Sequence, residues 1–197
     1  MFNPGRGYRN QFRIIAGTWR RRRLAFPALP DIRPSPDRVR ETLFNWLRER
    51  VAGARCLDLF AGSGALGLEA LSRGARQVTF VDQERQVVQA IGAHLQTLGA
   101  TGGEVVQAEA LAFLRGTPAA FDIVFLDPPF ASELLAATLP ALTQGGWLAH
   151  GAHLYMEYPA AAGVVIPAGW QIWRAGRAGR VGFALAVREP PQKLEAQ

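Results

Sequence analysis

A glycine-rich turn followed by an acidic residue is the first feature of this sequence that could do chemistry. The turn lies between an expected strand and an expected helix and contains the pattern Gly-x-Gly-x-x-Gly as Gly62, Gly64 and Gly67. Asp82 follows at the end of the next expected strand. Glycines let a backbone approach a ligand closely, and an acid at that place can accept hydrogen bonds from both ribose hydroxyls. The pattern predicts a site for a cofactor that contains a nucleoside.

A second acid, Asp58, bears on which cofactor this is. It ends the expected strand that leads into the turn. A carboxylate so close to the pyrophosphate of a dinucleotide would repel it, because that phosphate should bind at the start of the following helix. The same carboxylate could face the ammonium group of S-adenosylmethionine through water. Asp58 therefore favours S-adenosylmethionine, and a nicotinamide-dependent oxidoreductase remains the alternative from another class.

A double proline forms the second candidate site. The expected buried strand Phe121–Leu126 is followed by Asp127, Pro128, Pro129 and Phe130. The prolines fix an extended turn at the C-terminal edge of the sheet and remove two backbone donors. The remaining acceptors suit a planar base with an exocyclic amine, whose hydrogens Asp127 and the Pro128 carbonyl can accept while Phe130 stacks on the flipped base. This turn predicts methyl transfer to an amino nitrogen.

Positive charge is concentrated at the start of the chain. Residues 1–55 hold thirteen Arg and four acids, a net charge of +9, whereas residues 56–197 carry a net charge of −3. Basic segments attract phosphate backbones and release counterions on binding. We therefore expect this part to contact nucleic acid, with candidate phosphate contacts at Arg20, Arg21, Arg22, Arg23, Arg38 and Arg40.

A hairpin and a helix are expected ahead of the main sheet. Phe12–Trp19 has the pattern of a strand, and the arginine run after it suits a hairpin with an arginine-rich turn. Asp37–Arg50 places its apolar residues mostly on one face, as an amphipathic helix does. Ser35 is the expected N-cap of this helix, with Pro36 at its first helical position.

After Gly53, expected strands and helices alternate. The helices run from the glycine turn to Arg73 and over Glu84–Leu98, Ala108–Leu114 and Ser132–Leu142, and the strands are Cys56–Phe60, Val78–Val81, Val105–Gln107, Phe121–Leu126, Leu154–Tyr158, Trp170–Ala175 and Val181–Arg188. The last two strands can pair as an antiparallel hairpin. The pattern predicts an α/β, Rossmann-like fold with a seven-stranded, mostly parallel sheet covered on both faces.

These elements divide the chain into a basic extension over 1–53, a Rossmann-like domain over 54–189 and a flexible tail over 190–197. The single cysteine, Cys56, excludes an internal disulfide framework, and the first residues lack the apolar segment of a secretory signal. The uncharged stretch Leu134–Met156 is broken by proline and glycine, unlike a membrane span. We expect a cytoplasmic monomer.

Longer blocks of sequence carry a family resemblance. The Asp127–Phe130 turn resembles the signature of methyltransferases that act on exocyclic or amide nitrogens, and Arg13–Gly17, Arg33–Leu47 and Asp58–Arg73 resemble the bacterial RsmD family. The resemblance implies a class I methyltransferase fold and an enzyme that methylates N2 of a 16S ribosomal RNA guanine within the 30S subunit. The family's target is the loop nucleotide at position 966 of that RNA.

The resemblance also implies roles for single residues. The glycine turn and Asp82 would hold S-adenosylmethionine, and Asp127, Pro128 and Phe130 would hold the guanine. Glu109 stands where many such enzymes read the adenine amine of the cofactor with Asp or Asn; a plain acid at a helix N-terminus is the alternative.

The mechanism expected from these residues is a direct displacement. Hydrogen bonds from the guanine amine to Asp127 and the Pro128 carbonyl would localise the nitrogen lone pair and stabilise its growing positive charge, while positioning supplies much of the rate. It needs no metal and no nucleophilic cysteine, and the histidines, His94, His150 and His153, are expected to be structural.

Other functions remain open at this point. The Asp-Pro-Pro-Phe turn alone does not separate guanine N2 from adenine N6 of DNA or RNA, or from a glutamine side chain. A catalytically silent RNA-binding or assembly factor is a further alternative, which a test for methyl transfer would distinguish.

Overall fold

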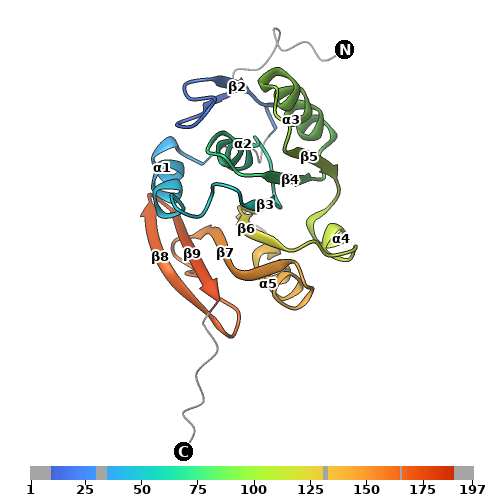
Figure 1. Ribbon diagram of the computed structural model, residues 1–197. Coiled ribbons are helices and arrows are strands. Elements are labelled where there is room, and N and C mark those ends of the chain that lie inside the picture. Colours follow the sequence, from blue (N-terminus) through green and yellow to red (C-terminus); the bar gives the residue numbers. More distant parts are fainter. Residues whose placement is uncertain (1–9, 30–34, 131–132, 165, 189–197) are drawn as a thin grey trace, which may run out of the picture.

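A seven-stranded mixed sheet forms the centre of the molecule in the computed structural model, which describes residues 10–29, 35–130, 133–164 and 166–188 (Figure 1). The strand order is β5-β4-β3-β6-β7-β9-β8. The first five strands in that order are parallel, and β9 is antiparallel to both β7 and β8. The strands are β3 (Arg55–Asp58), β4 (Gln77–Asp82), β5 (Gly103–Gln107), β6 (Phe121–Leu126), β7 (Leu148–Pro159), β8 (Trp170–Ala178) and β9 (Val181–Arg188). The predicted Rossmann-like sheet is confirmed.

Helices cover both faces of this sheet, as its near-continuous apolar parallel strands require. One face carries α1 (Asp37–Trp46), α2 (Ala65–Ser72) and α3 (Arg85–Leu98), and the other carries α4 (Ala110–Leu114) and α5 (Leu134–Gln144) (Figure 1). Each layer has its own apolar core. Phe80 and Phe125 belong to the first core, and Val81 and Val124 belong to the second.

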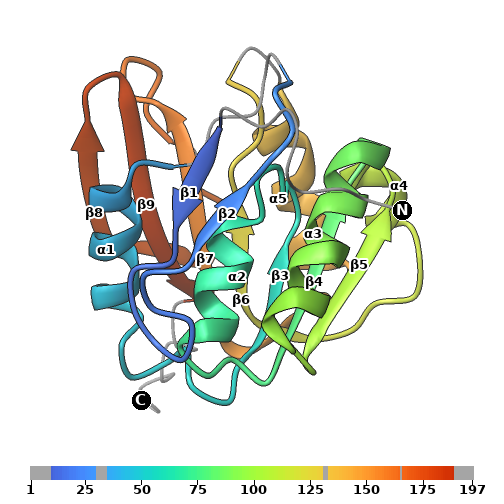
Figure 2. The same cartoon turned by 90° about the horizontal axis from the view of Figure 1, so that it is seen from above.

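The predicted N-terminal hairpin is present but shorter than expected. It consists of β1 (Gln11–Arg13) and β2 (Arg23–Ala25), and Figure 2 shows it lying across α2, between α1 and α3. The expected strand to Trp19 stops early because the backbone amides of Ile15 and Ala16 donate to the Glu69 carboxylate on α2, at 2.8 and 3.1 Å. Those amides are used to attach the chain to a helix instead of extending the hairpin.

The start of α1 differs from the prediction. Pro36 occupies the N-cap position, and no side chain caps the helix. The Ser35 hydroxyl points away from the helix amides and bonds Glu157 and Asp127, so its assignment as N-cap is wrong. The helix also ends at Trp46, and residues 47–50 form turns that lead towards β3.

The remaining elements follow the predicted order with small shifts at their ends. β7 begins at Leu148, earlier than the predicted Leu154, and its pairing with β6 contains a register shift between Phe121 and Ile123. The hairpin of β8 and β9 is confirmed. The predicted start of α5 at Ser132 and the predicted tail over 190–197 lie outside the described residues. In the described part of the chain, no helix has the length and apolarity of a bilayer span.

Candidate functional site

The two sequence motifs come together where the order of strands in the sheet reverses, between β3 and β6. β3 pairs with β4 on one side and with β6 on the other, so the connections after β3 and β6 leave on opposite faces. Ligands of open α/β sheets bind at the carboxyl ends of strands beside such a switch point. The glycine turn follows β3 and the Asp-Pro-Pro-Phe turn follows β6, and Asp58 stands opposite Phe125 in the strand register. The two predicted sites are therefore parts of one site.

The glycine turn is fastened by the acid of the next strand. Asp82 accepts hydrogen bonds from the backbone amides of Gly62 at 2.8 Å and Glu84 at 2.9 Å, one on each carboxylate oxygen. Gly62 and Gly64 have φ values of 48° and 76°, a region that glycine adopts without strain. Asp82 remains half-buried, and each of its oxygens keeps a lone pair for another donor. This geometry suits a ribose diol.

Asp58 is held more deeply. Its side chain is 2% exposed, and its Oδ2 accepts the backbone amide of Gly67 at 3.0 Å. Burial raises the pKa of Asp58 to about 7, with a further increase from the charge of Asp82 that the Gly67 hydrogen bond opposes. Gly67 packs its Cα against the Phe80 ring so closely that an added Cβ would lie 2.2 Å from it. Gly67 lies in α2, and its lack of a side chain lets this helix pack closely against Phe80.

Acidic side chains gather at the carboxyl edge of the sheet. The pKa values of Asp58, Asp82, Asp127 and Glu157 are all raised, in each case chiefly by burial. None of the ion pairs among the described residues involves these four side chains. Such a set of acceptors fits a ligand with a sulfonium and an ammonium group, and it disfavours a pyrophosphate. S-adenosylmethionine therefore fits the residues present.

The Asp-Pro-Pro-Phe turn presents acceptors and a ring. Asp127 is partly buried and Pro128 is buried, whereas the Phe130 side chain is 43% exposed. Burial raises the pKa of Asp127 well above its usual range, and the charges of Glu157 and Asp58 add to the effect. The exposed ring of Phe130 is available for stacking.

Three residues at this site were missed by the sequence reasoning. Ser35 Oγ lies 2.5 Å from Glu157 Oε1 and 3.3 Å from Asp127 Oδ2, and the Tyr155 hydroxyl donates to Glu157 Oε1 at 2.8 Å. Ser35, Tyr155 and Glu157 are all buried. A glutamate inside an apolar strand, two residues after a tyrosine and so on the same face, was the signal that could have found them.

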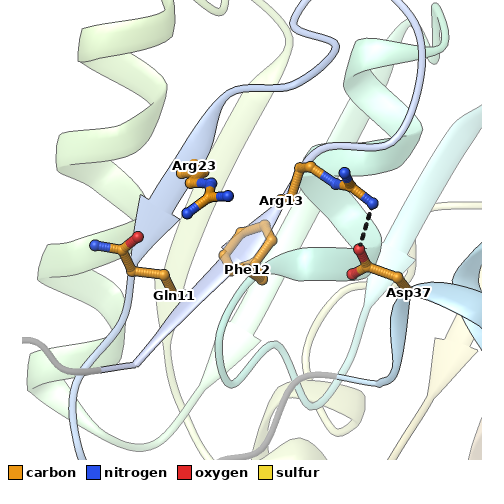
Figure 3. A pocket seen from close by; sticks show the side chains of 5 residues that line it. All are labelled: Gln11, Phe12, Arg13, Arg23 and Asp37. Carbon is orange, nitrogen blue, oxygen red and sulfur yellow. Dashed lines mark hydrogen bonds and ion pairs between the residues drawn. The ribbon is translucent and has the colours of Figure 1, made fainter.

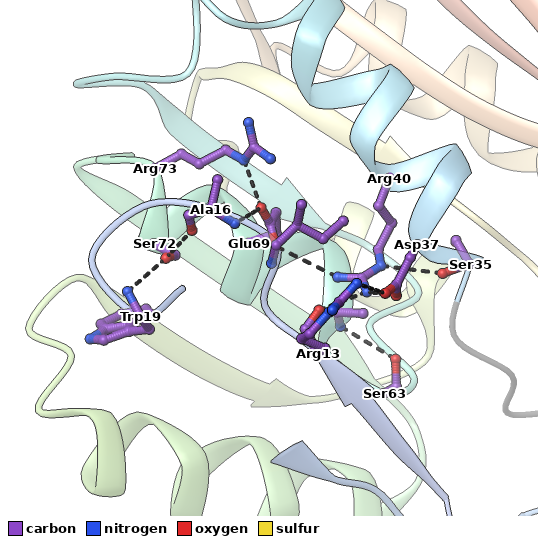
Figure 4. A network of polar contacts seen from close by, with 12 residues as sticks. Arg13, Ala16, Trp19, Ser35, Asp37, Arg40, Ser63, Glu69, Ser72 and Arg73 are labelled. Atoms are coloured by element: carbon purple, nitrogen blue, oxygen red, sulfur yellow. Dashed lines mark hydrogen bonds and ion pairs between the residues drawn. The ribbon is translucent and has the colours of Figure 1, made fainter. Parts of the chain in front are cut away.

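One of the predicted phosphate contacts is wrong. Arg40 is fully buried, and its guanidinium donates to Asp37 Oδ1 at 2.6 Å and to the Arg13 carbonyl at 2.8 Å (Figure 4). It also lies 3.6 Å from the buried carboxylate of Glu69. Arg40 faces the core side of α1 beside a buried acid, so it cannot reach a phosphate. The other candidate arginines, Arg20, Arg21, Arg22, Arg23 and Arg38, are exposed.

Glu109 lies at the carboxyl end of the strand next to the Asp82 strand, and the histidines His94 and His153 make contacts elsewhere. Glu109 is exposed at the N-cap position of α4, directly after β5, and its side chain makes no capping bond. The ring nitrogen Nε2 of His94 is 2.7 Å from the Ala25 carbonyl, which links α3 to β2. His153 packs edge-on against Trp173. The contacts of His94 and His153 link parts of the fold to one another.

Two surface hollows are lined by residues outside the two motif turns. The first, about 210 Å³ in volume, is lined by the hairpin and the start of α1: Gln11, Phe12, Arg13, Arg23 and Asp37, with Arg13 paired to Asp37 at 3.0 Å (Figure 3). The second, about 300 Å³, lies at the opposite edge of the sheet, near Asp122 and His153. Neither contains the two motif turns, so the candidate site is identified by its chemistry and topology.

Comparison with known proteins agrees with the fold and the motifs. A family model described as "Conserved hypothetical protein 95" matches residues 12–187. The chain is 46% identical over 199 residues to ribosomal RNA small subunit methyltransferase D of Escherichia coli K12, covering all of both chains. It is 39% identical to the Haemophilus influenzae protein of that name, covering 90% of this chain and 94% of the other.

A solved structure is similarly close. The yhhF protein of Escherichia coli superposes with a TM-score of 0.84 at 46% identity. The superposition covers 91% of this chain and 99% of that one. The similarity therefore extends over nearly the whole of both chains.

Proposed function

The chain belongs to the RsmD family, the family of ribosomal RNA small subunit methyltransferase D, and on that premise we propose that it methylates N2 of a guanine in 16S ribosomal RNA. The methyl donor is S-adenosylmethionine and the substrate is the small ribosomal subunit. The place of action is the cytoplasm, and the acting form is a monomer.

The observation that carries this proposal is the position of Asp127 and Pro128 beside the glycine turn. The two turns end adjacent parallel strands at the switch point of the sheet. One turn offers a diol acceptor, Asp82, and the other offers carboxylate and carbonyl acceptors with an exposed ring at Phe130. A nucleoside cofactor and a flipped base with an exocyclic amine have complementary groups.

The residues then take distinct roles in the mechanism. S-adenosylmethionine, when bound, supplies the methyl group. Asp127 and the Pro128 carbonyl accept the amine hydrogens, which orients the nitrogen lone pair and stabilises the positive charge that grows there. Phe130 stacks on the base and holds its plane, so that the reacting atoms meet in line.

The remaining site residues bind the two partners. The glycine turn with Asp58 and Asp82 holds the cofactor, and Glu109 reads its adenine amine. The basic extension over 1–53 contacts RNA through the exposed arginines of the hairpin and α1. Because loops of RNA are recognised by shape and splayed bases, a compact extension of this kind suits such a target.

Transfer of tritium from labelled S-adenosylmethionine tests the proposal. The acceptors are unmodified 30S subunits, free 16S RNA and duplex DNA, and the product nucleosides are separated. Label in N2-methylguanosine from 30S subunits is the expected result, and Asp127→Ala, which removes the acceptor, is the matched inactive control. Label in N6-methyladenosine, or no label in any acceptor despite cofactor binding, would overturn it.

A further inference from the structure

A buried chain of hydroxyl and carboxyl groups connects Asp127 to the interior of the protein, and the mechanism above does not use it. Ser35, just ahead of α1, lies between Asp127 at the end of β6 and Glu157 on β7, 3.3 Å and 2.5 Å from their nearest carboxylate oxygens. Glu157 is 3% exposed and also accepts the Tyr155 hydroxyl. Three segments distant in sequence converge on one carboxylate of the active turn.

The number of hydrogen atoms available limits which hydrogen bonds these three side chains can make at once. Ser35 has one hydroxyl hydrogen and two carboxyl neighbours, and it can donate to one of them only. The second contact is a hydrogen bond only when the other carboxyl is protonated and donates to Ser35. The arrangement is therefore complete when Asp127 and Glu157 together hold one proton, as paired carboxylates in a buried site commonly do.

The surroundings of the pair support such sharing. Burial raises the pKa of Glu157, and the hydrogen bonds from Ser35 and Tyr155 partly oppose that increase. The charge of Glu157 adds to the raised pKa of Asp127. The other charged groups near the pair are Asp58 on β3 and the Arg40 guanidinium on α1, which donates to the Ser35 carbonyl at 3.2 Å. Glu157 thus holds its charge more readily than Asp127.

We propose that Ser35 and Glu157 are positioning residues that set the protonation state of Asp127 during methyl transfer. In the resting protein the shared proton sits on Asp127, whose O–H donates to Ser35, and Ser35 donates to Glu157. As positive charge develops on the guanine nitrogen, the Asp127 proton passes to Ser35 Oγ and the Ser35 proton passes to Glu157 Oε1. Two O–H bonds break and two form, so Asp127 becomes a carboxylate facing the new charge.

The step after transfer also balances. One N–H bond of the methylated nitrogen breaks, its electron pair stays on nitrogen, and the proton goes to Asp127. The pair then holds two protons, and one returns to solvent. This inference rests on the proposed function, because it assigns the chain of groups to the same reaction.

A pH profile of single-turnover methyl transfer tests the proposal. In Glu157→Gln the Asp127 proton has no carboxylate to pass to, so Asp127 must lose it to solvent before transfer. Because Glu157 holds its charge more readily than Asp127, the acid limb of the profile moves to higher pH. Ser35→Ala breaks the connection and lowers the single-turnover rate about fivefold, the effect of one lost hydrogen bond. Ser35→Thr keeps the hydroxyl and restores the wild-type position of the limb. A Glu157→Gln enzyme with reduced rate and an unmoved acid limb would show a merely structural role and overturn the proposal.

A second measurement needs no substrate. Urea unfolding of the cofactor-free protein across pH 4 to 9 reports the raised pKa values. A carboxyl that holds its proton more tightly in the folded state makes the free energy of unfolding fall as pH rises. The wild-type curve should fall with pH more steeply than that of Glu157→Gln. Parallel curves would overturn the coupling even if methyl transfer occurs, whereas steeper wild-type loss without any methyl transfer would overturn the proposed function alone.

Discussion

Replacing Asp58 by asparagine should make the protein more stable and a poorer binder of its cofactor. Asp58 is 2% exposed, and asparagine can keep an oxygen in place to accept the hydrogen bond from the Gly67 amide. Burial raises the pKa of Asp58 from 3.8 to about 7. Because a tenfold change in proton affinity is worth about 1.4 kcal/mol, ionising this buried group costs about 4 kcal/mol.

The size of the effect depends on pH in a defined direction. A raised carboxyl pKa means that the folded state holds the proton more tightly than the unfolded state, so wild-type stability falls as pH rises from about 4 to about 7. The Asp58→Asn protein lacks that loss. The difference in free energy of unfolding between Asp58→Asn and wild type should be close to zero below pH 4, should grow to about 4 kcal/mol near pH 7 and should stay constant above that pH. In a chain of this length that corresponds to roughly 8–16 °C in Tm.

Urea unfolding of the cofactor-free proteins at pH 4, 5.5, 7 and 8.5 measures this difference, and isothermal titration measures the weaker cofactor binding. Asp122→Asn is the matched control, since Asp122 also accepts a backbone amide, from Arg55 at 2.8 Å, but is only half-buried. A constant difference between Asp58→Asn and wild type across the pH range, or a loss of stability at pH 8.5, would refute the reasoning.

Three further variants test separate parts of the structure. Glu69→Ala removes the carboxylate that accepts two backbone amides and pairs with buried and half-buried arginines, and urea unfolding should show a loss of about 3–5 kcal/mol; a loss below 1 kcal/mol would contradict a structural role. Gly67→Ala places a Cβ 2.2 Å from the Phe80 ring and should lower stability by about 1–3 kcal/mol, measured by thermal unfolding. Gly92→Ala is the control, because a Cβ at this half-buried helix position would meet no atom within 4 Å. Replacing Arg20–Arg23 by glutamine should flatten the salt dependence of RNA binding in filter assays, because each lost phosphate contact removes about 0.7–0.9 from the slope; an unchanged slope would remove the hairpin from the RNA interface.

The sequence predicted those parts of the site whose chemistry is local. The glycine turn, Asp82 and the Asp-Pro-Pro-Phe turn each follow a strand, so strand–turn–helix order alone places them at one edge of the sheet. Ser35 and Glu157 could not be found in this way, because they meet Asp127 only after three distant segments converge. Arg40 shows the converse error, since charge composition gave no indication that this arginine faces a buried acid.

The attachment of the hairpin to α2 has a mechanical consequence. Glu69 and Ser72 on α2 accept hydrogen bonds from Ile15, Ala16 and Trp19 in the loop that joins β1 and β2, while the other end of the same short helix begins at the glycine turn. The arginine loop and the cofactor turn are thus attached to the same helix. Because α2 joins them, the loop and the turn keep a fixed distance from each other. A substrate must therefore have its phosphates and its target base spaced to match that distance in order to present the base at Asp127.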